Sequence, residues 1–181
     1  MFIKNLTLQN FKNHSSQFIE FSPQINCLVG DNGVGKTNIL DALHYLSVGK
    51  SFLGNSDLNN IAENEDFFSI EALIFNENKE DIVKIIQNKE SRKTIKKNDK
   101  NYSKIADHIG YLPSVMISPY DQNLISDSSE SRRKFMDAMI SQTDREYLFS
   151  LIHYQKTLQQ RNALLKNFQK SRTFDSDSLE I

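Results

Sequence analysis

The chain has 181 residues, of which 38% are hydrophobic and 25% charged, and its formal net charge is −1. This length allows one domain, or one domain and part of a second, and the composition is typical of a folded globular protein. No apolar run approaches the roughly 20 residues of a membrane-spanning helix, and the N-terminus lacks the features of a signal peptide. The single cysteine, Cys27, excludes an internal disulfide framework and a cysteine-based zinc site. We therefore expect a cytoplasmic protein without a membrane partner.

The beginning of the chain predicts three strands and a helix. Residues 1–8 and 16–21 alternate apolar and polar side chains, which is typical of strands. Residues 25–29 are a short apolar run before a glycine, and we predict a buried strand there with Cys27 inside it. Apolar residues recur at helical spacing in 36–48, which predicts a helix that stops at the following glycine.

The middle of the chain favours antiparallel β-structure. Within residues 67–101, two apolar or alternating runs, 69–75 and 81–86, are separated by Asn-Glu-Asn-Lys, and a second turn signal follows at 98–99. This pattern predicts an antiparallel meander. Residues 114–117 predict one more short strand, which a proline ends.

From residue 121 onward the pattern is helical. Asp127 and Thr143 are each followed three residues later by a glutamate, which is the capping-box signature of a helix start. Apolar and aromatic residues recur every three or four positions in 147–168. That stripe suits either an ordinary amphipathic helix packed on its neighbour or a coiled-coil-like helix. Residues 171–181 are rich in Ser and Asp, and we expect a linker or a frayed end.

A phosphate-binding motif lies between the predicted strand at 25–29 and the predicted helix at 36–48. Residues 30–37, Gly-Asp-Asn-Gly-Val-Gly-Lys-Thr, match G-x-x-x-x-G-K-[ST] at every fixed position. The glycines let backbone N–H groups approach phosphate oxygens, and the helix N-terminus adds partial positive charge. Lys36 supplies a cation for the outer phosphates and Thr37 a hydroxyl for Mg²⁺. The sequence therefore predicts binding of a nucleoside triphosphate, most simply ATP with Mg²⁺.

The chain lacks a second acidic motif. P-loop ATPases hold Mg²⁺ and position water with an acidic residue that follows an apolar strand. The apolar runs after the P-loop are followed instead by Asn76, Gln87 and Ser118. We therefore predict nucleotide binding, assign no catalytic residue, and do not expect this chain to hydrolyse ATP alone.

Sequence blocks spread along almost the whole chain point to one family. These blocks are residues 10–14, 30–38, 41–42, 49–52, 118–121, 131–137 and 154–166. In their order and spacing they resemble the N-terminal half of RecF, a bacterial DNA replication and repair family. The resemblance implies an α/β P-loop fold, namely part of an ABC-type ATPase head related to the heads of SMC and Rad50 proteins.

The resemblance also suggests a division of the chain. Residues 1–120 would form the N-terminal part of the ATPase head, including the antiparallel meander. Residues 121–170 would start a helical arm domain, and 171–181 would be the linker or frayed end.

RecF proteins are about twice this long, as expected for two domains. Their later half carries the ABC signature and the second acidic motif. By resemblance, the full-length protein would be an ATPase that dimerises around ATP and binds DNA at gaps, where single and double strands meet. It would work with RecO and RecR to promote RecA loading, and so support repair and the SOS response.

Two other functions stay open. One is a structural clamp head of the SMC or Rad50 kind, a nucleotide-binding module without hydrolysis. A long heptad arm after residue 181 would favour it. The other is a small-molecule P-loop kinase, which the meander at 67–101 disfavours.

The resemblance assigns nucleotide contacts residue by residue. The P-loop residues carried over are Gly30, Asn32, Gly33, Gly35, Lys36, Thr37 and Asn38. Lys12 and Asn13 fall where related heads place residues near the nucleotide, and Lys12 suits either a phosphate contact or a solvated surface. Asp121 or the adjacent Gln122 would stand where related ATPases sense Mg²⁺ and water.

Two basic clusters could contact DNA. Arg132 and Arg133 suit either the phosphate backbone or a salt-bridged helix face with Glu130 and Asp137. The lysines of 93–100 fit a solvated sheet edge better. The four histidines have no ligand spacing, so we assign no metal to them.

Overall fold

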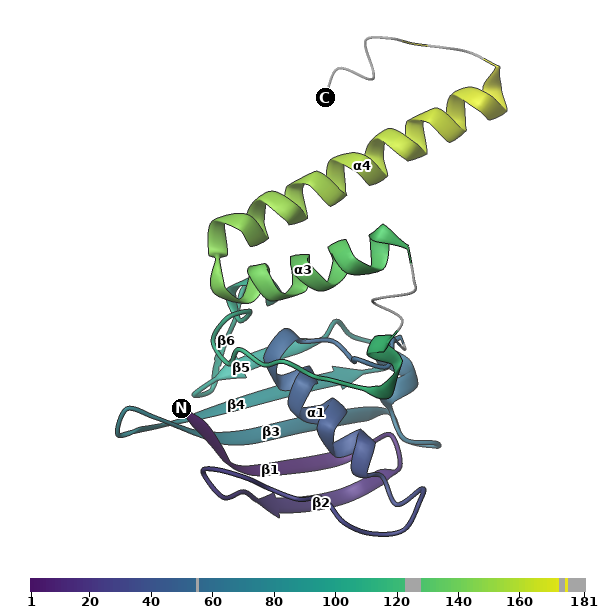
Figure 1. Ribbon diagram of the computed structural model, residues 1–181. Coiled ribbons are helices and arrows are strands. Elements are labelled where there is room, and N and C mark those ends of the chain that lie inside the picture. The colour runs from purple at the N-terminus through teal and green to yellow at the C-terminus, as the bar shows by residue number, and fades with distance from the viewer. Residues whose placement is uncertain (55, 123–127, 173–174, 176–181) are drawn as a thin grey trace. The chain divides into compact units, whose positions relative to one another are not determined.

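The computed structural model describes residues 1–54, 56–122, 128–172 and 175, and side chains at all of these except Tyr120 and Gln122 (Figure 1). The chain divides into two compact units, Met1–Asp121 and Gln122–Ile181. Within the described part of the chain, no helix combines the length and hydrophobicity needed to cross a bilayer.

A six-stranded antiparallel sheet forms the first unit, in the order β2-β1-β3-β4-β5-β6. This confirms the predicted meander. The turns after β3 and β5 are tight because their two central residues, Glu77-Asn78 and Asn98-Asp99, all have positive φ. The strands are β1 Phe2–Phe11, β2 His14–Glu20, β3 Phe67–Asn76, β4 Lys79–Asn88, β5 Thr94–Lys97 and β6 Lys100–Asn101.

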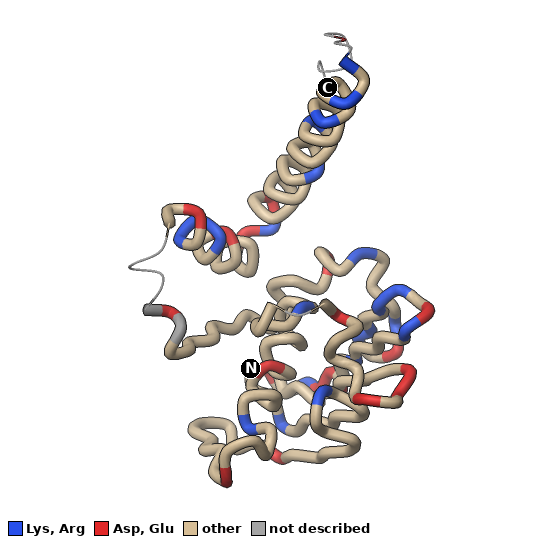
Figure 2. Tube along the Cα trace, turned by 90° about the vertical axis from the view of Figure 1, so that its right-hand side faces the viewer, with Lys and Arg blue, Asp and Glu red and all other residues tan. Residues whose placement is uncertain are grey.

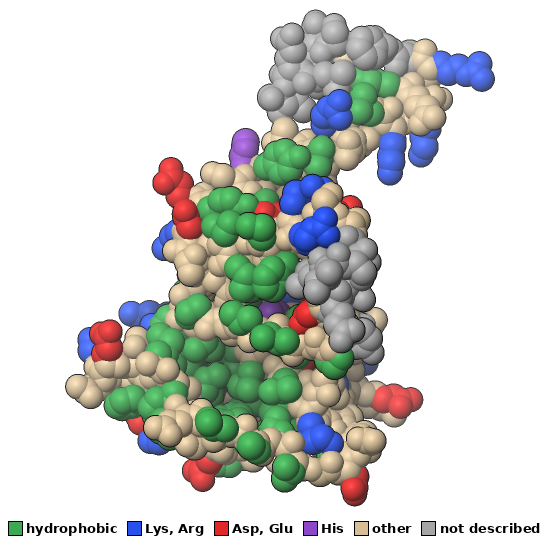
Figure 3. All heavy atoms as spheres, viewed as in Figure 1, with side chains coloured by type: hydrophobic (Ala, Val, Ile, Leu, Met, Phe, Trp, Pro, Cys, Tyr) green, Lys and Arg blue, Asp and Glu red, His purple; other side chains and the backbone are tan. Residues whose placement is uncertain are grey.

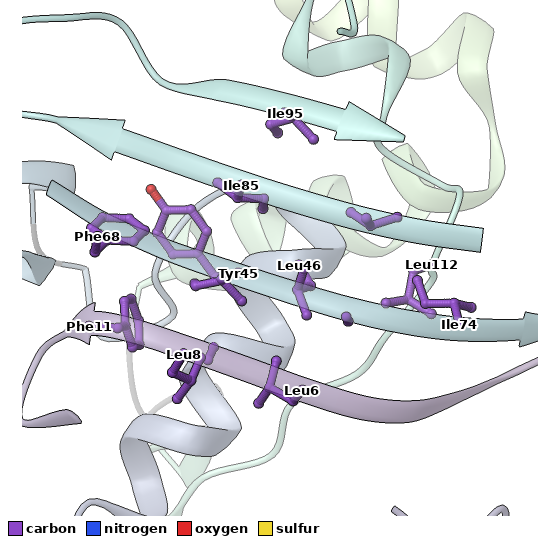
Figure 4. Packing of buried hydrophobic residues seen from close by; sticks show 14 of the residues in the cluster. Leu6, Leu8, Phe11, Tyr45, Leu46, Phe68, Ile74, Ile85, Ile95 and Leu112 are labelled. Carbon is purple, nitrogen blue, oxygen red and sulfur yellow. The ribbon is translucent and has the colours of Figure 1, made fainter. Parts of the chain in front are cut away.

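One helix, α1 (Lys36–Val48), lies across one face of this sheet and closes the core (Figures 1 and 4). Tyr45 and Leu46 are fully buried against apolar side chains of β1, β3 and β4. The Tyr45 ring meets Phe11 and Phe68 edge-on, at centroid distances of 6.2 and 5.5 Å. The helix ends at Gly49, whose φ of 70° suits glycine and whose N–H donates to the Tyr45 carbonyl.

The strands predicted at 25–29 and 114–117 do not form. Both segments lie outside every ladder of the described residues, and their apolar side chains are exposed, 84% at Ile25 and 83% at Ile117. Cys27, predicted to be buried, is exposed as well. The reason is physical, because an apolar run becomes a strand only when a neighbouring strand satisfies its N–H and C=O groups. In the first unit, exposed hydrophobic side chains gather on the face that carries α1 (Figure 3).

The described part of the second unit contains two helices, α3 (Ser129–Thr143) and α4 (Arg145–Ser171). The cap of α4 is Asp144 and not the predicted Thr143, because the Asp144 carboxylate accepts the Tyr147 N–H at 2.9 Å. The Thr143 hydroxyl donates instead to the Ile140 carbonyl within α3. The other predicted cap, Asp127, lies outside the described residues, as does nearly all of 173–181.

The described residues also form three short 3-10 helices: η1 (Asp57–Asn60), η2 (Ile105–Asp107) and η3 (Pro119–Gln122). Lys93 links η1 to the C-terminal end of α1, and so does not lie on the solvated sheet edge that the sequence predicted for it. The Lys93 side chain is only 9% exposed, and its ammonium donates to the Gly49 carbonyl and to Asp57, both at 2.6 Å. Tyr45 donates to the same carboxylate, and burial together with Asp57 raises the pKa of Tyr45 well above its usual range. This cluster ties the start of β5 and η1 to the end of α1.

We predict that Lys93→Met lowers the free energy of unfolding by about 2–3 kcal/mol, because Asp57 and the Gly49 carbonyl lose their cationic donor in a buried setting. Lys96→Met is the matched control on β5 and should cost about 0.5 kcal/mol or less. Urea unfolding of both variants tests this. Equal losses would contradict the anchoring role of Lys93.

Candidate nucleotide-binding site

The P-loop leads directly into the N-terminus of α1. No side chain caps this end of the helix, where Gly35 precedes Lys36. The N–H groups of the first turn lack helical partners and carry partial positive charge, so they suit an anion. The sequence folds this way because the apolar side of α1 is held on the sheet while its polar N-terminal turn projects beyond the core.

Gly35 tolerates no side chain. Its φ is 99°, in the region that favours glycine. A Cβ atom at Gly35 would lie 2.4 Å from Nε2 of His14 and 2.7 Å from Oδ1 of Asn13. The P-loop therefore packs tightly against the turn between β1 and β2.

A cavity of about 240 Å³ opens at this helix terminus. It is smaller than the roughly 300 Å³ at which small-molecule sites begin, so it suits the phosphate end of a nucleotide. Six of the predicted nucleotide contacts line it: Asn32, Gly33, Gly35, Lys36, Thr37 and Asn38.

The Lys36 ammonium folds back over the loop. It donates to the carbonyls of Gly30 and Asp31 at 2.8 and 2.7 Å. These contacts hold the cation at the cavity, where an incoming phosphate would be a stronger, charged acceptor.

A larger hollow of about 930 Å³ lies along α4, lined by residues of 149–160. Every lining residue that the structure describes belongs to α4. Because a nucleotide needs donors that converge from several directions, we assign the site to the smaller cavity.

Lys12 takes part in a largely buried ion pair and does not lie on a solvated surface. Its ammonium lies 2.6 Å from a carboxylate oxygen of Asp41, and the two side chains are 10% and 0% exposed. Asp41 also accepts the Ser51 hydroxyl at 2.8 Å and the Phe52 N–H at 2.7 Å. Asp41 therefore joins three segments behind the P-loop. A phosphate contact by Lys12 would require it to leave this carboxylate.

His44 lies beside this cluster on α1. Its ring meets the Phe52 ring edge-on. Burial lowers its pKa, and the nearby Asp41 carboxylate offsets only part of that effect. His44 is consequently neutral at pH 7.

Asn13 and Asn38 reach the P-loop from two sides. Asn13 donates to the Gly33 carbonyl at 3.2 Å and accepts from Asn38 at 2.8 Å. The next residue, His14, contacts the Gly35 carbonyl through Nε2 at 3.2 Å. Our sequence analysis missed His14, because a lone histidine carries no ligand spacing. Its position directly after Asn13 was the available signal.

Of the candidate Mg²⁺ residues with described side chains, Thr37 lines the cavity and Asp121 is not among the lining residues. The Asp121 carboxylate accepts the Ser118 N–H at 2.5 Å and caps its own turn. The Gln122 side chain lies outside the description. Among the described residues, no three His, Cys, Asp or Glu side chains gather as metal ligands. The Thr37 hydroxyl fits Mg²⁺, which often binds through one or two protein oxygens, phosphates and water.

The candidate DNA residues lie in the second unit, on α3. Arg133 donates to the Ser129 hydroxyl at 3.2 Å. The nearby Glu130 pairs with Lys134 at 2.7 Å, and this contact lowers the pKa of Glu130. Asp137 accepts the hydroxyl of Tyr147 from α4. Lys and Arg residues also recur along α4 (Figure 2).

Comparison with known proteins gives a consistent family. A model described as an AAA domain matches residues 5–180. The DNA replication and repair protein RecF of Flavobacterium johnsoniae is 50% identical over 182 aligned residues, which cover 100% of this chain and 50% of that protein. RecF of Phocaeicola vulgatus is 45% identical, with 100% of this chain and 48% of the relative covered.

Solved structures agree with this similarity. A structure of the recombination mediator protein RecF with ATP, in the RecFOR pathway, matches with a TM-score of 0.90 and 33% identity. That match covers 98% of this chain and 48% of the RecF chain. An SMC ATPase structure matches with a TM-score of 0.61 at 20% identity, over 77% of this chain and 99% of the other, which shows a shared fold. The predicted P-loop ATPase-head fold and the resemblance to RecF are thereby confirmed. The chain spans about half the length of the curated relatives it matches.

We predict that Asp41→Ala lowers the free energy of unfolding by about 3 kcal/mol, because the buried Lys12 ammonium loses its partner. The double variant Lys12→Met, Asp41→Leu removes both charges and should recover more than half of that loss. Chemical denaturation measures both. A double variant no more stable than Asp41→Ala would mean that the Asp41 contacts to Ser51 and Phe52, not the ion pair, dominate.

Proposed function

Because this chain belongs to the AAA domain family and matches the N-terminal half of RecF proteins, we propose that it is the ATP-capturing part of a DNA replication and repair protein. The cavity at the N-terminus of α1 carries this proposal. It joins unpaired backbone N–H groups, the Lys36 ammonium and the Thr37 hydroxyl. These groups would hold the phosphates of ATP and its Mg²⁺, whose charge would offset that of the phosphates.

Hydrolysis, in this proposal, needs residues beyond these 181. The exposed apolar segments 25–29 and 114–117 are suited to pair with further strands, and such strands would complete the α/β sheet of an ATPase head. Relatives about twice as long support this idea. The added half would carry the signature and acidic motifs of an ABC-type ATPase that works as a dimer.

The biological role follows the same family. We propose a bacterial, cytoplasmic protein that binds gapped DNA at junctions between single and double strands. It would act with RecO and RecR in loading RecA, and so in recombinational repair and the SOS response. The alternative of an SMC-like clamp rests on the length of α4 and on its exposed Ile152, Tyr154 and Leu158. A long coiled-coil arm in the complete protein would favour that alternative.

Replacing the P-loop lysine tests capture of the nucleotide. Lys36→Met should weaken binding of a fluorescent ATP analogue with Mg²⁺ about 10- to 100-fold, because charge-assisted bonds to phosphate are lost. Lys50→Met removes an exposed lysine just beyond α1 and should leave the affinity unchanged. Fluorescence anisotropy measures both. Equal binding by the two variants would reject the site.

The DNA contact has its own test. Replacing Arg132 and Arg133 by Ala should lower the slope of log affinity against log salt by about 2, since each lost phosphate contact removes close to 1. The control variant Lys4→Ala, Lys89→Ala removes the same charge from residues paired with Glu80 and Asp66, and its slope should not change. Titrations of gapped DNA at several salt concentrations decide. An unchanged slope in the arginine variant would mean that these two arginines do not contact DNA phosphates.

A further inference from the structure

Side chains at the turn between β1 and β2 hold the P-loop by contacting the carbonyl groups of that loop. Phe11 and His14 are paired across the two strands, so the turn contains only two residues, Lys12 and Asn13. Lys12 takes a positive φ of 54°, a conformation that costs a non-glycine residue about 1 kcal/mol. This tight turn brings Asn13 and His14 to consecutive positions that face the P-loop.

The two side chains reach two different peptide groups. Asn13 donates to the Gly33 carbonyl and Nε2 of His14 contacts the Gly35 carbonyl, both at 3.2 Å. The Gly35 carbonyl also accepts the Ile39 N–H at 3.0 Å, the first hydrogen bond of α1. A carbonyl can accept two hydrogen bonds, so the contact with His14 adds to the helix and does not compete with it.

Because a peptide group is planar, a contact that fixes the direction of its C=O also fixes the direction of its N–H. In a trans peptide the C=O and the following N–H point in opposite directions, and the described residues contain no cis peptide bond. Fixing the Gly35 carbonyl toward His14 and α1 therefore turns the Lys36 N–H away from them, toward the cavity. The same reasoning applies to the Gly33 carbonyl and the Val34 N–H.

His14 has little freedom to leave this position. It is 9% exposed, and its ring lies where any Cβ on Gly35 would be. Asn13 is held in turn by Asn38, which donates to it from the first turn of α1. The Gly35 carbonyl offers His14 only an acceptor, so Nε2 carries the proton in this contact.

We propose that His14 is a positioning residue for phosphate binding. Its Nε2–H donates to the Gly35 carbonyl and fixes the peptide plane that aims the Lys36 N–H at the phosphate. This inference rests on the proposed nucleotide-binding function and adds to it a residue outside the P-loop motif. His14 does not touch the nucleotide. By fixing the loop in advance, His14 lowers the conformational entropy that the loop loses when phosphate binds.

A matched pair of substitutions separates the donor from the side-chain volume. His14→Gln keeps an N–H donor on a flexible side chain. His14→Met introduces a side chain of nearly the same length and shape as that glutamine, but without a donor. In the full chain, we would measure the affinity for a fluorescent ATP analogue with Mg²⁺. We would also record the amide resonance of Lys36 in ¹H–¹⁵N spectra with and without ADP. His153→Met, at an exposed position on α4, is the control.

We expect the Met variant to bind about tenfold or more weakly, and the Gln variant to stay within about threefold of the unsubstituted chain. The Lys36 amide should shift on ADP binding in the unsubstituted chain and the Gln variant, and much less in the Met variant. Equal affinities and equal Lys36 shifts in the Met and Gln variants would overturn the proposal.

Folding is checked by thermal melts, and His14→Phe provides a second donor-free variant that keeps an aromatic ring. If both donor-free variants unfold while the Gln variant folds, His14 serves stability and the positioning role is rejected. If the unsubstituted chain itself binds no nucleotide, the proposed function fails instead, and that result is distinct from any difference among the His14 variants.

Discussion

The seating of α1 on the sheet is the constraint on which the rest of the first unit depends. Tyr45 and Leu46 pack into the core, and two buried lysines from other elements fix the helix. Lys12 pairs with Asp41 near its N-terminal half, and Lys93 caps its C-terminal end at Gly49. A helix held at both places cannot slide or rotate without leaving a charge buried and unpaired. The P-loop is therefore joined to a helix whose position on the sheet is fixed.

Three neighbouring parts of the first unit form or support the candidate phosphate site. The groups suited to hold phosphate come from α1 and the P-loop, and the β1–β2 turn holds the loop in place. The antiparallel sheet supports α1 and the turn. Ile25 and Ile117 are exposed, and the segments 25–29 and 114–117 lie outside the strands that the structure describes. The two segments lie on either side of α1 in the sequence. The candidate phosphate site therefore lies within the first unit.

Local patterns predicted local structure well, and long-range contacts poorly. The limits of α1 and the two tight turns of the meander followed from hydrophobic period and turn residues alone. The prediction of a strand at 25–29 was wrong: the composition suits a strand, but no strand of the described residues pairs with this segment. The cap of α4 shifted by one residue, from Thr143 to Asp144, since either side chain can cap a helix. The contacts of Lys93 and His14 join elements far apart in sequence, so no spacing rule could identify them.

The most direct test of the account is hydrogen–deuterium exchange of the chain with and without ATP and Mg²⁺. We predict slower exchange at the amides of residues 33–39 and in the β1–β2 turn, because phosphate satisfies the free N–H groups and the turn holds the loop. Exchange in residues 149–160, along the larger hollow of α4, should not change. Protection confined to α4, or none in the P-loop at saturating nucleotide, would contradict the claim that the N-terminus of α1 is a preformed phosphate site.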